Sequence, residues 1–496
     1  MLNLYTEGHR GFCAEYPENT LLSYEAAIDL GVDAFEFDIW LSKDKVPVLM
    51  HDGDTMRTCG VPGHLRDRTL TEIKTLCPSN PAKFGDKFAG KVQVPTLREL
   101  LELVKSKRPD MKLGVEIKEY TEETVDIAVA MLKEYGKFED CWFYAFNGRI
   151  IRYLKEKYNA RTMGYPDLQM GEFDGYDCYD EIGLSMTYVR SELCAFYRAK
   201  GLPMHMYCAD TEADVRLCIE RGASLITAND PRPLLRVKEE IGRCVLEAHQ
   251  GVASDAPGNT MAAFQLAVEQ GYGMIELDTK FTADNRCVVL HDRTVNRTCR
   301  AADGAPLPDE TKIAELTFEE ARALDAGVAF GEQYRGEKIP AIEEVLALAK
   351  ESGIRVKFDN VTQSHTSEQR AILYNLIEAS GALPLCGFTA SQIWLIEEVL
   401  KRFPAAQIHY DGPLDDESLV KVAVLVPKEQ LTVWQRADNG YASNWCKVPP
   451  VTDESAAKIH EIGRLGLWLL TKPEELAVAV ARYRADVIET SGLLKP

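Results

Sequence analysis

The stretch VDAFEFDIWLSKDKVPVLMHD, residues 32–52, decides the fold. Residues 32–40 and 46–51 are short runs of apolar and β-branched residues, as buried strands are. Two acidic residues, Glu36 and Asp38, interrupt the first run. Because alternate residues of a strand point to the same face, both carboxylates lie on one side of it. The stretch therefore predicts a buried strand that carries a polar site.

The same stretch returns 240 positions later (276 − 36). Glu36-Phe37-Asp38 and His51-Asp52 reappear as Glu276-Leu277-Asp278 and His291-Asp292, and Gly8-His9-Arg10-Gly11 and Pro17-Glu18-Asn19-Thr20 reappear as Ala248-His249-Gln250-Gly251 and Pro257-Gly258-Asn259-Thr260. A period this long indicates whole domains in tandem, not a solenoid of small units. We therefore predict two domains, residues 1–240 and 241–496.

Within each half, apolar runs alternate with amphipathic stretches. In the first half further strands are expected at 112–118, 141–146, 202–208 and 224–227, and helices at 20–30, 97–106, 121–135, 149–157 and 234–247. Such alternation is typical of parallel strands joined by crossover helices. About eight units in roughly 240 residues, with no glycine-rich dinucleotide turn after the first strand, favour a closed barrel. The predicted fold class is α/β, with two tandem (β/α)₈ TIM barrels.

Composition and cysteine usage indicate a soluble protein of a reducing compartment. Hydrophobic residues make up 46% of the chain, and no apolar run approaches the roughly 20 residues that span a bilayer. Residues 1–10 lack the basic start and apolar core of a secretory signal. The 13 cysteines include no pair at the two-residue spacing of a zinc knuckle. We therefore expect a cytoplasmic protein with free thiols and no stable membrane insertion.

The formal net charge of −20 bears on the partners. A surface of this sign repels polyanions, which disfavours a nucleic-acid partner. A small anionic substrate stays compatible with it, because a bound divalent cation and a few basic side chains reverse the field inside one pocket. The sequence does not decide the oligomeric state, and a homo-oligomer is compatible with it.

Polar residues gather at the predicted strand ends. His9 and Arg10 end the first strand, Glu36 and Asp38 the second, His51 and Asp52 the third, and Glu116 and Lys118 the fourth. Active sites of such barrels lie at this carboxyl-terminal rim. Three carboxylates without a cysteine suit a hard divalent cation, Mg²⁺ or Ca²⁺, better than zinc.

Basic side chains and imidazoles complete the predicted site. Arg10 and Lys118 match a phosphate in charge, and the guanidinium of Arg10 can hold two of its oxygens at once. Of His9 and His51, one can take a proton from a nucleophile while the other gives one to a leaving alcohol. The residues thus predict metal-assisted acid–base chemistry on a phosphate ester.

Taken in order, these motifs resemble the glycerophosphodiester phosphodiesterase family. The motifs are His9-Arg10-Gly11, Glu18-Asn19-Thr20, Glu36-Phe37-Asp38, Pro47-Val48-Leu49-Met50-His51-Asp52, Pro95-Thr96-Leu97 and Val115-Glu116-Ile117-Lys118. Weaker echoes at Ala145-Phe146-Asn147 and Leu225-Ile226-Thr227 extend the resemblance over essentially the whole first half. Each tripeptide alone carries little information, whereas the ordered set is specific.

The resemblance implies a TIM barrel of the phospholipase C-like phosphodiesterase type that cleaves glycerophosphodiesters into glycerol 3-phosphate and an alcohol. The residues that it implies are Glu36, Asp38 and Glu116 for one divalent cation, His9 and His51 for acid–base catalysis, and Arg10 for the phosphate. Attack by the substrate's own neighbouring hydroxyl would give a cyclic phosphate, which water then opens. Tyr207-Cys208 and Ala228-Asn229 depart from the family pattern, and we expect them on the alcohol side of the pocket.

Several site residues change in the second half. Gln250 matches Arg10, Gly258 matches Glu18, and the Val-Lys-Phe-Asp run at 356–359 matches the strand of Glu116 and Lys118. In this alignment Lys357 replaces the metal-binding glutamate and Asp359 the phosphate-facing lysine, and each has the wrong charge. We therefore predict a degenerate second barrel that serves as a packing partner, a wall of the first site or a binder of another ligand. An inward-turned Asp359 would instead restore a metal site.

Two other functions stay open at this point. Phospholipase D-like toxins share the barrel and the paired histidines and stop at the cyclic phosphate, so a phosphodiester lyase is one alternative. A non-catalytic scaffold that binds phosphate ligands is the other. The complete carboxylate set of the first half favours the hydrolase. The sequence does not indicate which alcohol is released.

Overall fold

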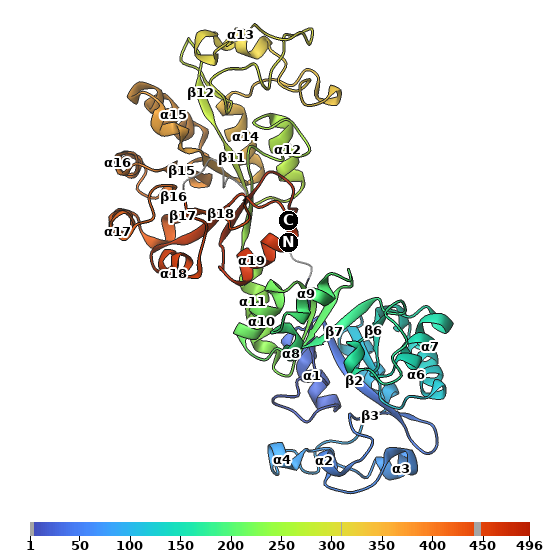
Figure 1. Cartoon of the computed structure of the whole chain (residues 1–496). Helices are drawn as coiled ribbons and strands as arrows, with labels where there is room; N and C mark the ends of the chain where they lie inside the picture. Colours follow the sequence, from blue (N-terminus) through green and yellow to red (C-terminus); the bar gives the residue numbers. More distant parts are fainter. Residues whose placement is uncertain (1–3, 309, 441–447) are drawn as a thin grey trace. The chain divides into compact units, whose positions relative to one another are not determined.

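The computed structural model describes residues 4–308, 310–440 and 448–496. The chain divides into two compact units between Glu240 and Ile241. In each unit a barrel of parallel strands is surrounded by helices (Figure 1). The predicted fold of two (β/α)₈ barrels is confirmed.

The first barrel closes because its first strand pairs with both the second and the last. Its strands are β1 (Tyr5–Gly8), β2 (Ala34–Leu41), β4 (Lys112–Ile117), β5 (Cys141–Tyr144), β6 (Thr162–Gly164), β7 (Glu181–Ser185), β8 (Met204–Tyr207) and β9 (Ala223–Ala228). The helices around it are α1 (Leu21–Leu30), α5 (Leu97–Lys107), α6 (Glu122–Glu134), α7 (Gly148–Tyr158), α8 (Met186–Val189), α9 (Leu193–Arg198), α10 (Glu212–Glu220) and α11 (Pro231–Gly242).

Local sequence explains where the first helices begin and end. The Thr20 side chain accepts a hydrogen bond from the Ser23 amide at the start of α1, and Gly31 ends that helix in the left-handed conformation. Thr96 and Glu99 form a capping box at the start of α5. These caps fix the helices that return the chain from β1 to β2 and lead it into β4.

The structure corrects three predicted elements. Residues 46–51 were expected as the third barrel strand, but β3 (Pro47–Leu49) pairs antiparallel with the outer end of β2, so the third barrel strand is β4. The predicted helix 234–247 ends at Gly242, because residues 245–248 begin the second barrel. Strands β6 and β7 were not predicted, since both are short and the second begins with a glutamate.

The second barrel repeats this plan with its own insertion. Its strands are β10 (Val245–Ala248), β11 (Met274–Leu277), β14 (Arg355–Phe358), β15 (Cys386–Ala390), β16 (Gln407–Tyr410), β17 (Leu431–Arg436), β18 (Arg464–Trp468) and β19 (Val487–Thr490), and β12 (Thr279–Phe281) and β13 (Cys287–Val289) form a hairpin. Its helices are α12 (Met261–Glu269), α14 (Ile342–Ser352), α15 (Ser367–Ser380), α16 (Ile393–Arg402), α17 (Asp416–Leu425), α18 (Asp453–Ile462) and α19 (Pro473–Ala481).

Each barrel carries an insertion that leaves the rim after its β-hairpin. The first holds α2 (Met56–Cys59), α3 (Leu70–Ile73) and α4 (Pro81–Phe84), and the second holds α13 (Phe318–Ala323). Figure 1 shows both insertions as lobes at the hairpin side of their own barrel. Residues of these insertions therefore stand beside the carboxyl ends of the strands.

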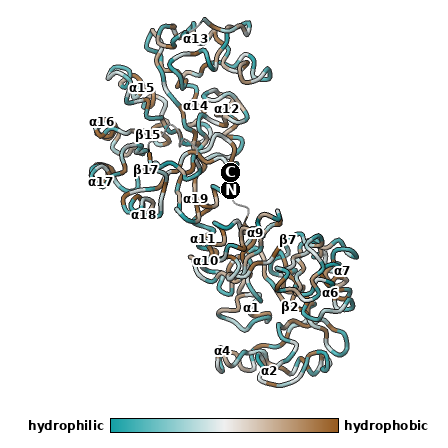
Figure 2. Tube along the Cα trace, in the orientation of Figure 1, coloured by the Kyte–Doolittle hydropathy of each residue, from teal (hydrophilic) through white to brown (hydrophobic). Residues whose placement is uncertain are grey.

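Packing turns the polar residues of β2 toward the barrel axis. Phe35, Phe37 and Ile39 are fully buried in the core between the barrel and its helices, and each such side chain contributes roughly 1.5–3 kcal/mol. Because strand residues alternate, Glu36 and Asp38 face the interior. Hydrophobic and hydrophilic residues alternate along the surrounding helices (Figure 2), as on helices with one buried face.

No helix within the described residues has both the length and the apolar character of a membrane span. The cytoplasmic location stays a prediction.

Candidate active site

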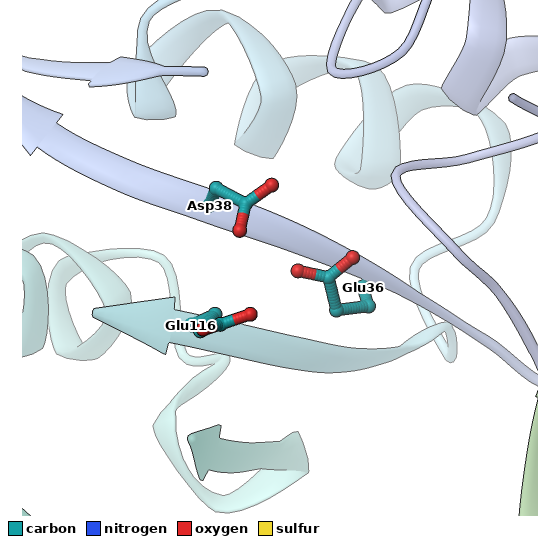
Figure 3. A group of neighbouring side chains, drawn as sticks. All are labelled: Glu36, Asp38 and Glu116. Atoms are coloured by element: carbon teal, nitrogen blue, oxygen red, sulfur yellow. The ribbon is translucent and has the colours of Figure 1, made fainter. Parts of the chain in front are cut away.

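Three buried carboxylates from two neighbouring strands meet in the first barrel. Glu36 and Asp38 lie on β2, and Glu116 lies on β4 in register with Asp38. One oxygen of each lies within 4.8 Å of the others, and Figure 3 shows the three carboxylates turned toward one another. The structure therefore brings together the three residues predicted to hold a metal.

Burial makes this cluster electrostatically costly. It raises the pKa of Glu36 well above its ordinary value, and the charges of Asp38 and Glu116 add to the effect. Burial likewise raises the pKa of Glu116 to about 7. Burial also opposes the ionisation of Asp38, but Lys118 and Arg10 hold its pKa below the ordinary range. Three such groups favour a bound cation.

An unpaired oxygen supports the fit of a divalent ion. Glu36 Oε1 is buried and has no hydrogen-bond partner among the described residues. A buried acceptor of this kind is uncommon unless something else binds it. An all-oxygen set suits Mg²⁺ or Ca²⁺. The residues present therefore fit a hard divalent cation.

The two basic residues predicted to hold phosphate lie on these carboxylates. Arg10 Nε is 3.3 Å from Asp38 Oδ2, and Arg10 Nη1 is 2.9 Å from Glu18 Oε1. Lys118 Nζ is 2.6 Å from Glu116 Oε1 and 3.3 Å from Asp38 Oδ1. Arg10 also adopts a left-handed φ of 52°, which turns its amide toward Glu36 Oε2 at 3.0 Å. Backbone strain of this kind is concentrated at functional sites.

Both predicted histidines are oriented through Nδ1. His9 Nδ1 lies 2.7 Å from Asn229 Oδ1, and His51 Nδ1 lies 2.6 Å from Asp52 Oδ1. Because each partner is an acceptor, Nδ1 carries the proton and Nε2 of a neutral ring is free to accept one. Burial, reinforced by Arg10, lowers the pKa of His9 to about 4. Burial also lowers the pKa of His51.

The sequence did not reveal Asp210 as a site residue, nor the contact of Asn229 with His9. Asp210 accepts hydrogen bonds from the backbone amide and from Nδ2 of Asn229, at 2.6 and 2.7 Å. This pair of bonds fixes which atom of the Asn229 amide faces His9. Asn229 was expected on the alcohol side of the pocket, and the structure places it against the imidazole of His9. Its position directly after β9, at the rim, is the signal that could have found it.

A chain of hydrogen-bonded side chains, called the relay here, connects His51 to Arg10 through Asp52, Arg57 and Glu18. Arg57 Nε donates to Asp52 at 2.5 Å, and its two terminal nitrogens donate to Glu18 at 2.9 and 2.7 Å. Glu18 in turn accepts from Arg10. The acidic residues of this relay belong to the predicted motifs, whereas Arg57 comes from the insertion. The relay connects one imidazole to the predicted phosphate ligand.

The site opens into a cavity of about 270 Å³. His9, His51, Glu36, Glu116 and Lys118 line one part of it, and Phe146, Met163, Tyr165 and Tyr207 form an apolar wall. The rings of Phe146 and Tyr165 stack at 3.7 Å. Tyr207 and Cys208, which depart from the family pattern, lie on this lining. The cavity therefore places an apolar surface next to the two histidines that are predicted to act as acid and base.

The model of the Glycerophosphoryl diester phosphodiesterase family matches residues 9–232 and, a second time, residues 249–440. The chain belongs to this family. A Glycerophosphodiester phosphodiesterase from Caldanaerobacter subterraneus subsp. tengcongensis is 28% identical over 249 residues, 47% of this chain and 97% of that protein. One from Bacillus subtilis is 27% identical over 267 residues, 48% of this chain and 87% of that protein.

A solved structure of the glycerophosphodiester phosphodiesterase from Agrobacterium tumefaciens is also similar. It is 24% identical, with a TM-score of 0.41, and the match covers 48% of this chain and all of that one.

In the second glycerophosphodiester phosphodiesterase match, the register overturns the alignment drawn from the sequence. Glu276 of β11 pairs with Lys357, whereas Glu36 pairs with Gly114. Lys357 therefore stands at the position of Gly114, and Asp359 stands at that of Glu116. Oxygens of Glu276, Asp278 and Asp359 lie within 4.8 Å of one another. The offset between the repeats is 240 at β11 (276 − 36) and 243 at β14 (357 − 114), and the longer insertion hid this change.

The surroundings of this second cluster differ from those of the first. Across the described parts of the chain, no lysine or arginine nitrogen forms an ion pair with its three carboxylates. Gln250 Nε2 lies 3.3 Å from Asp278 Oδ2, where the first barrel has Arg10. Lys357 instead lies deeper, with Nζ 2.6 Å from both Glu247 and Glu489. The second barrel thus keeps three carboxylates and loses the cations that accompany them.

Proposed function

We propose that the first barrel, residues 1–240, hydrolyses glycerophosphodiesters to glycerol 3-phosphate and an alcohol. The observation that carries this proposal is the meeting of three buried carboxylates beside two oriented imidazoles in one cavity. Family membership supports it, as do two relatives that are named Glycerophosphodiester phosphodiesterase. The substrate is a small molecule, and the apolar wall suits the organic part of a diester.

In this proposal Glu36, Asp38 and Glu116 hold one divalent cation, Mg²⁺ or Ca²⁺. When bound, such an ion polarises the phosphoryl oxygens and offsets the charge that develops on them. Arg10 and Lys118 now neutralise the carboxylates. With the carboxylates satisfied by an ion, their positive groups are available to bind the phosphate.

His9 and His51 divide the acid and base roles. One Nε2 takes the proton from the attacking hydroxyl, and the other ring donates a proton to the leaving alcohol oxygen as the P–O bond breaks. If the attacking group is the neighbouring hydroxyl of the glycerol, a cyclic phosphate forms and water then opens it. Asn229 and Asp52 hold the two rings in the orientation that these transfers need.

The second barrel, residues 241–496, is proposed to be catalytically silent. Gln250 and Gly258 stand where the first barrel has Arg10 and Glu18. A phosphodiester carries a negative charge, and three carboxylates that form no ion pair with an arginine or lysine within the described residues repel it. The retained His249 and His291 therefore have no phosphodiester to act on.

Turnover of glycerophosphocholine and glycerophosphoethanolamine, with and without EDTA, tests the proposal. We expect EDTA to abolish activity and Mg²⁺ or Ca²⁺ to restore it. Phosphorus NMR should show glycerol 3-phosphate as the final product, and accumulation of a cyclic phosphate would indicate a lyase instead. Activity that survives chelation contradicts the metal site.

A further inference from the structure

A second cavity of about 270 Å³ lies in the second barrel, away from its three carboxylates. Its polar lining comes from Gln250, Asn259, His291, Arg297 and Thr298, and its apolar lining from Leu290, Ala326 and Phe330. Glu276, Asp278 and Asp359 do not line it. The cavity thus stands beside the acidic cluster without facing it.

The cavity includes the place where the first barrel has a carboxylate that the second barrel lacks. Gly258 lines it, and the matching residue of the first barrel is Glu18. There the Glu18 carboxylate fills the space between Arg10 and Arg57 and accepts hydrogen bonds from both. In the second barrel Gly258 has no such side chain. The cavity there is lined by Gln250 and Arg297, the counterparts of the two residues that bind the Glu18 carboxylate.

The replacement of Glu18 by Gly258 also leaves Arg297 without the carboxylate that its counterpart Arg57 binds. Arg57 uses all three guanidinium nitrogens, Nε on Asp52 and both terminal nitrogens on Glu18. Arg297 keeps the first of these bonds, to Asp292. Its two terminal nitrogens donate no hydrogen bond within the described residues, and the side chain is 61% exposed at the cavity. Two parallel donors on a guanidinium match the two oxygens of a carboxylate or phosphate.

We propose that this cavity binds a small organic oxyanion, a carboxylate or a phosphate monoester, in the place of the missing Glu18 carboxylate. The oxyanion accepts from the terminal nitrogens of Arg297. Leu290, Ala326 and Phe330 contact its apolar part. A volume just below the roughly 300 Å³ at which drug-sized pockets begin limits the ligand to a few non-hydrogen atoms beyond the anionic group.

The proposed anion site of the second barrel is a binding site, whereas the site of the first barrel is proposed to be catalytic. No carboxylate cluster lines the cavity, so the anion is held without a metal beside it. The proposal does not depend on turnover in the first barrel, and it gives the second barrel a binding role of its own.

Calorimetric titration of the full chain with inorganic phosphate, and separately with acetate, tests the proposal. An Arg10→Gln background gives the first barrel the residue that the second carries, which weakens anion binding there. On this background we expect Arg297→Met to weaken binding of the preferred probe at least about tenfold, because charge-assisted hydrogen bonds contribute roughly 1.5–3 kcal/mol. Tighter binding of phosphate indicates a phosphate monoester, and tighter binding of acetate indicates a carboxylate.

Two further variants complete the design. Gly258→Glu restores the carboxylate of the first barrel and should block both probes. Arg286→Met removes the same charge from a surface pair with Glu343 and should leave binding unchanged. Absence of binding on the Arg10→Gln background, or equal binding with and without Arg297, overturns the proposal. Arg297→Met alone should not alter turnover, so loss of the site and loss of the proposed catalysis are separately visible.

Discussion

The Nδ1 atom of His9 lies 2.7 Å from Oδ1 of Asn229, a residue 220 positions further along the chain. The partner of His51, by contrast, is the carboxylate of its neighbour Asp52. An amide oxygen carries no net charge, so it stabilises the charged form of an imidazole less than a carboxylate does. The two histidines of one cavity are therefore held by partners of different charge.

Asn229 is expected to be a positioning residue for His9. Asn229→Ala removes the acceptor at Nδ1, so we expect kcat to fall about 10–100-fold with little change in KM, the size of effect seen when an orienting partner is lost. Asn229→Asp keeps an acceptor and should recover part of the rate. Steady-state kinetics on glycerophosphocholine measure both values.

The matching control is Asp210→Asn. Asp210 accepts from Asn229 without touching His9, so a smaller fall in kcat is expected. A loss of folded protein in all three variants, or an unchanged kcat in Asn229→Ala, would remove Asn229 from this role.

Glu116 and Asp359 offer a matched pair for the metal site, because register places them at the same position of the two barrels. Glu116→Gln removes one charged ligand of the proposed ion, and we expect turnover to fall about a hundredfold or more. Asp359→Asn should leave turnover within about twofold. Initial rates at saturating Mg²⁺ and Ca²⁺ give the comparison. The reverse ranking would move catalysis to the second barrel.

The sequence predicts those site residues that belong to short sequence patterns, and it does not predict contacts between residues far apart in the chain. Glu36 and Asp38 were predictable together because the two-residue period of a strand is local, and Glu116 because its motif resembles the family. Asn229 and His9 follow paired strands, β9 and β1, that lie at opposite ends of the sequence of this barrel, and no sequence pattern around either residue marks their contact. The carboxylates of the site thus follow from local patterns, whereas the orienting partner of His9 follows from barrel closure.

The alignment that matched Asp359 with Lys118 was wrong for a related reason, whereas the alternative of an inward-turned Asp359 agrees with the structure. The alignment drawn from the sequence paired Lys357 with Glu116, an offset of 241 (357 − 116), whereas the register gives 243 (357 − 114). A sequence without a structure does not show where the extra residues of the longer insertion lie. The strand register in the structure gives the correct alignment. An error of two residues along a strand keeps a side chain on the same face but changes its depth within the barrel.

Lys357 is expected to be a main stabilising residue of the second barrel. It is buried between Glu247 and Glu489, burial raises the pKa of Glu247 to about 8, and Lys357 lowers the pKa of Glu489 to about 2 against the effect of burial. Lys357→Met leaves two buried carboxylates without their cation, and loss of one partner in such a group costs about 3–5 kcal/mol. Urea unfolding followed by circular dichroism should show a lower midpoint.

The control for Lys357 removes the negative charges together with the positive one. The triple variant with Glu247→Gln and Glu489→Gln should recover part of the midpoint, because no unpaired charge is then buried. If Lys357→Met unfolds at the wild-type midpoint, the ion pairs contribute nothing and the lysine serves only to fill space.

Asp33 gives the first barrel a pH-dependent contribution to stability. Its Oδ2 accepts from the Thr6 amide and hydroxyl, both at 2.8 Å, and from Lys238 at 2.6 Å. Burial opposes ionisation, but these donors lower the pKa of Asp33 below 3.8. A lowered folded-state pKa stabilises the fold above the unfolded pKa, and this contribution disappears as the pH falls through the folded pKa.

We therefore expect Asp33→Asn to lower the free energy of unfolding by about 1 kcal/mol at pH 7, because it replaces charge-assisted hydrogen bonds with neutral ones at a partly exposed position. The difference from the wild type should shrink once the pH falls below 3.8, where the wild-type carboxyl begins to bind a proton in the unfolded chain. Urea midpoints measured for both proteins between pH 7 and pH 3 test the sign. A difference that grows as the pH falls would show that the ionised carboxylate of Asp33 destabilises the barrel.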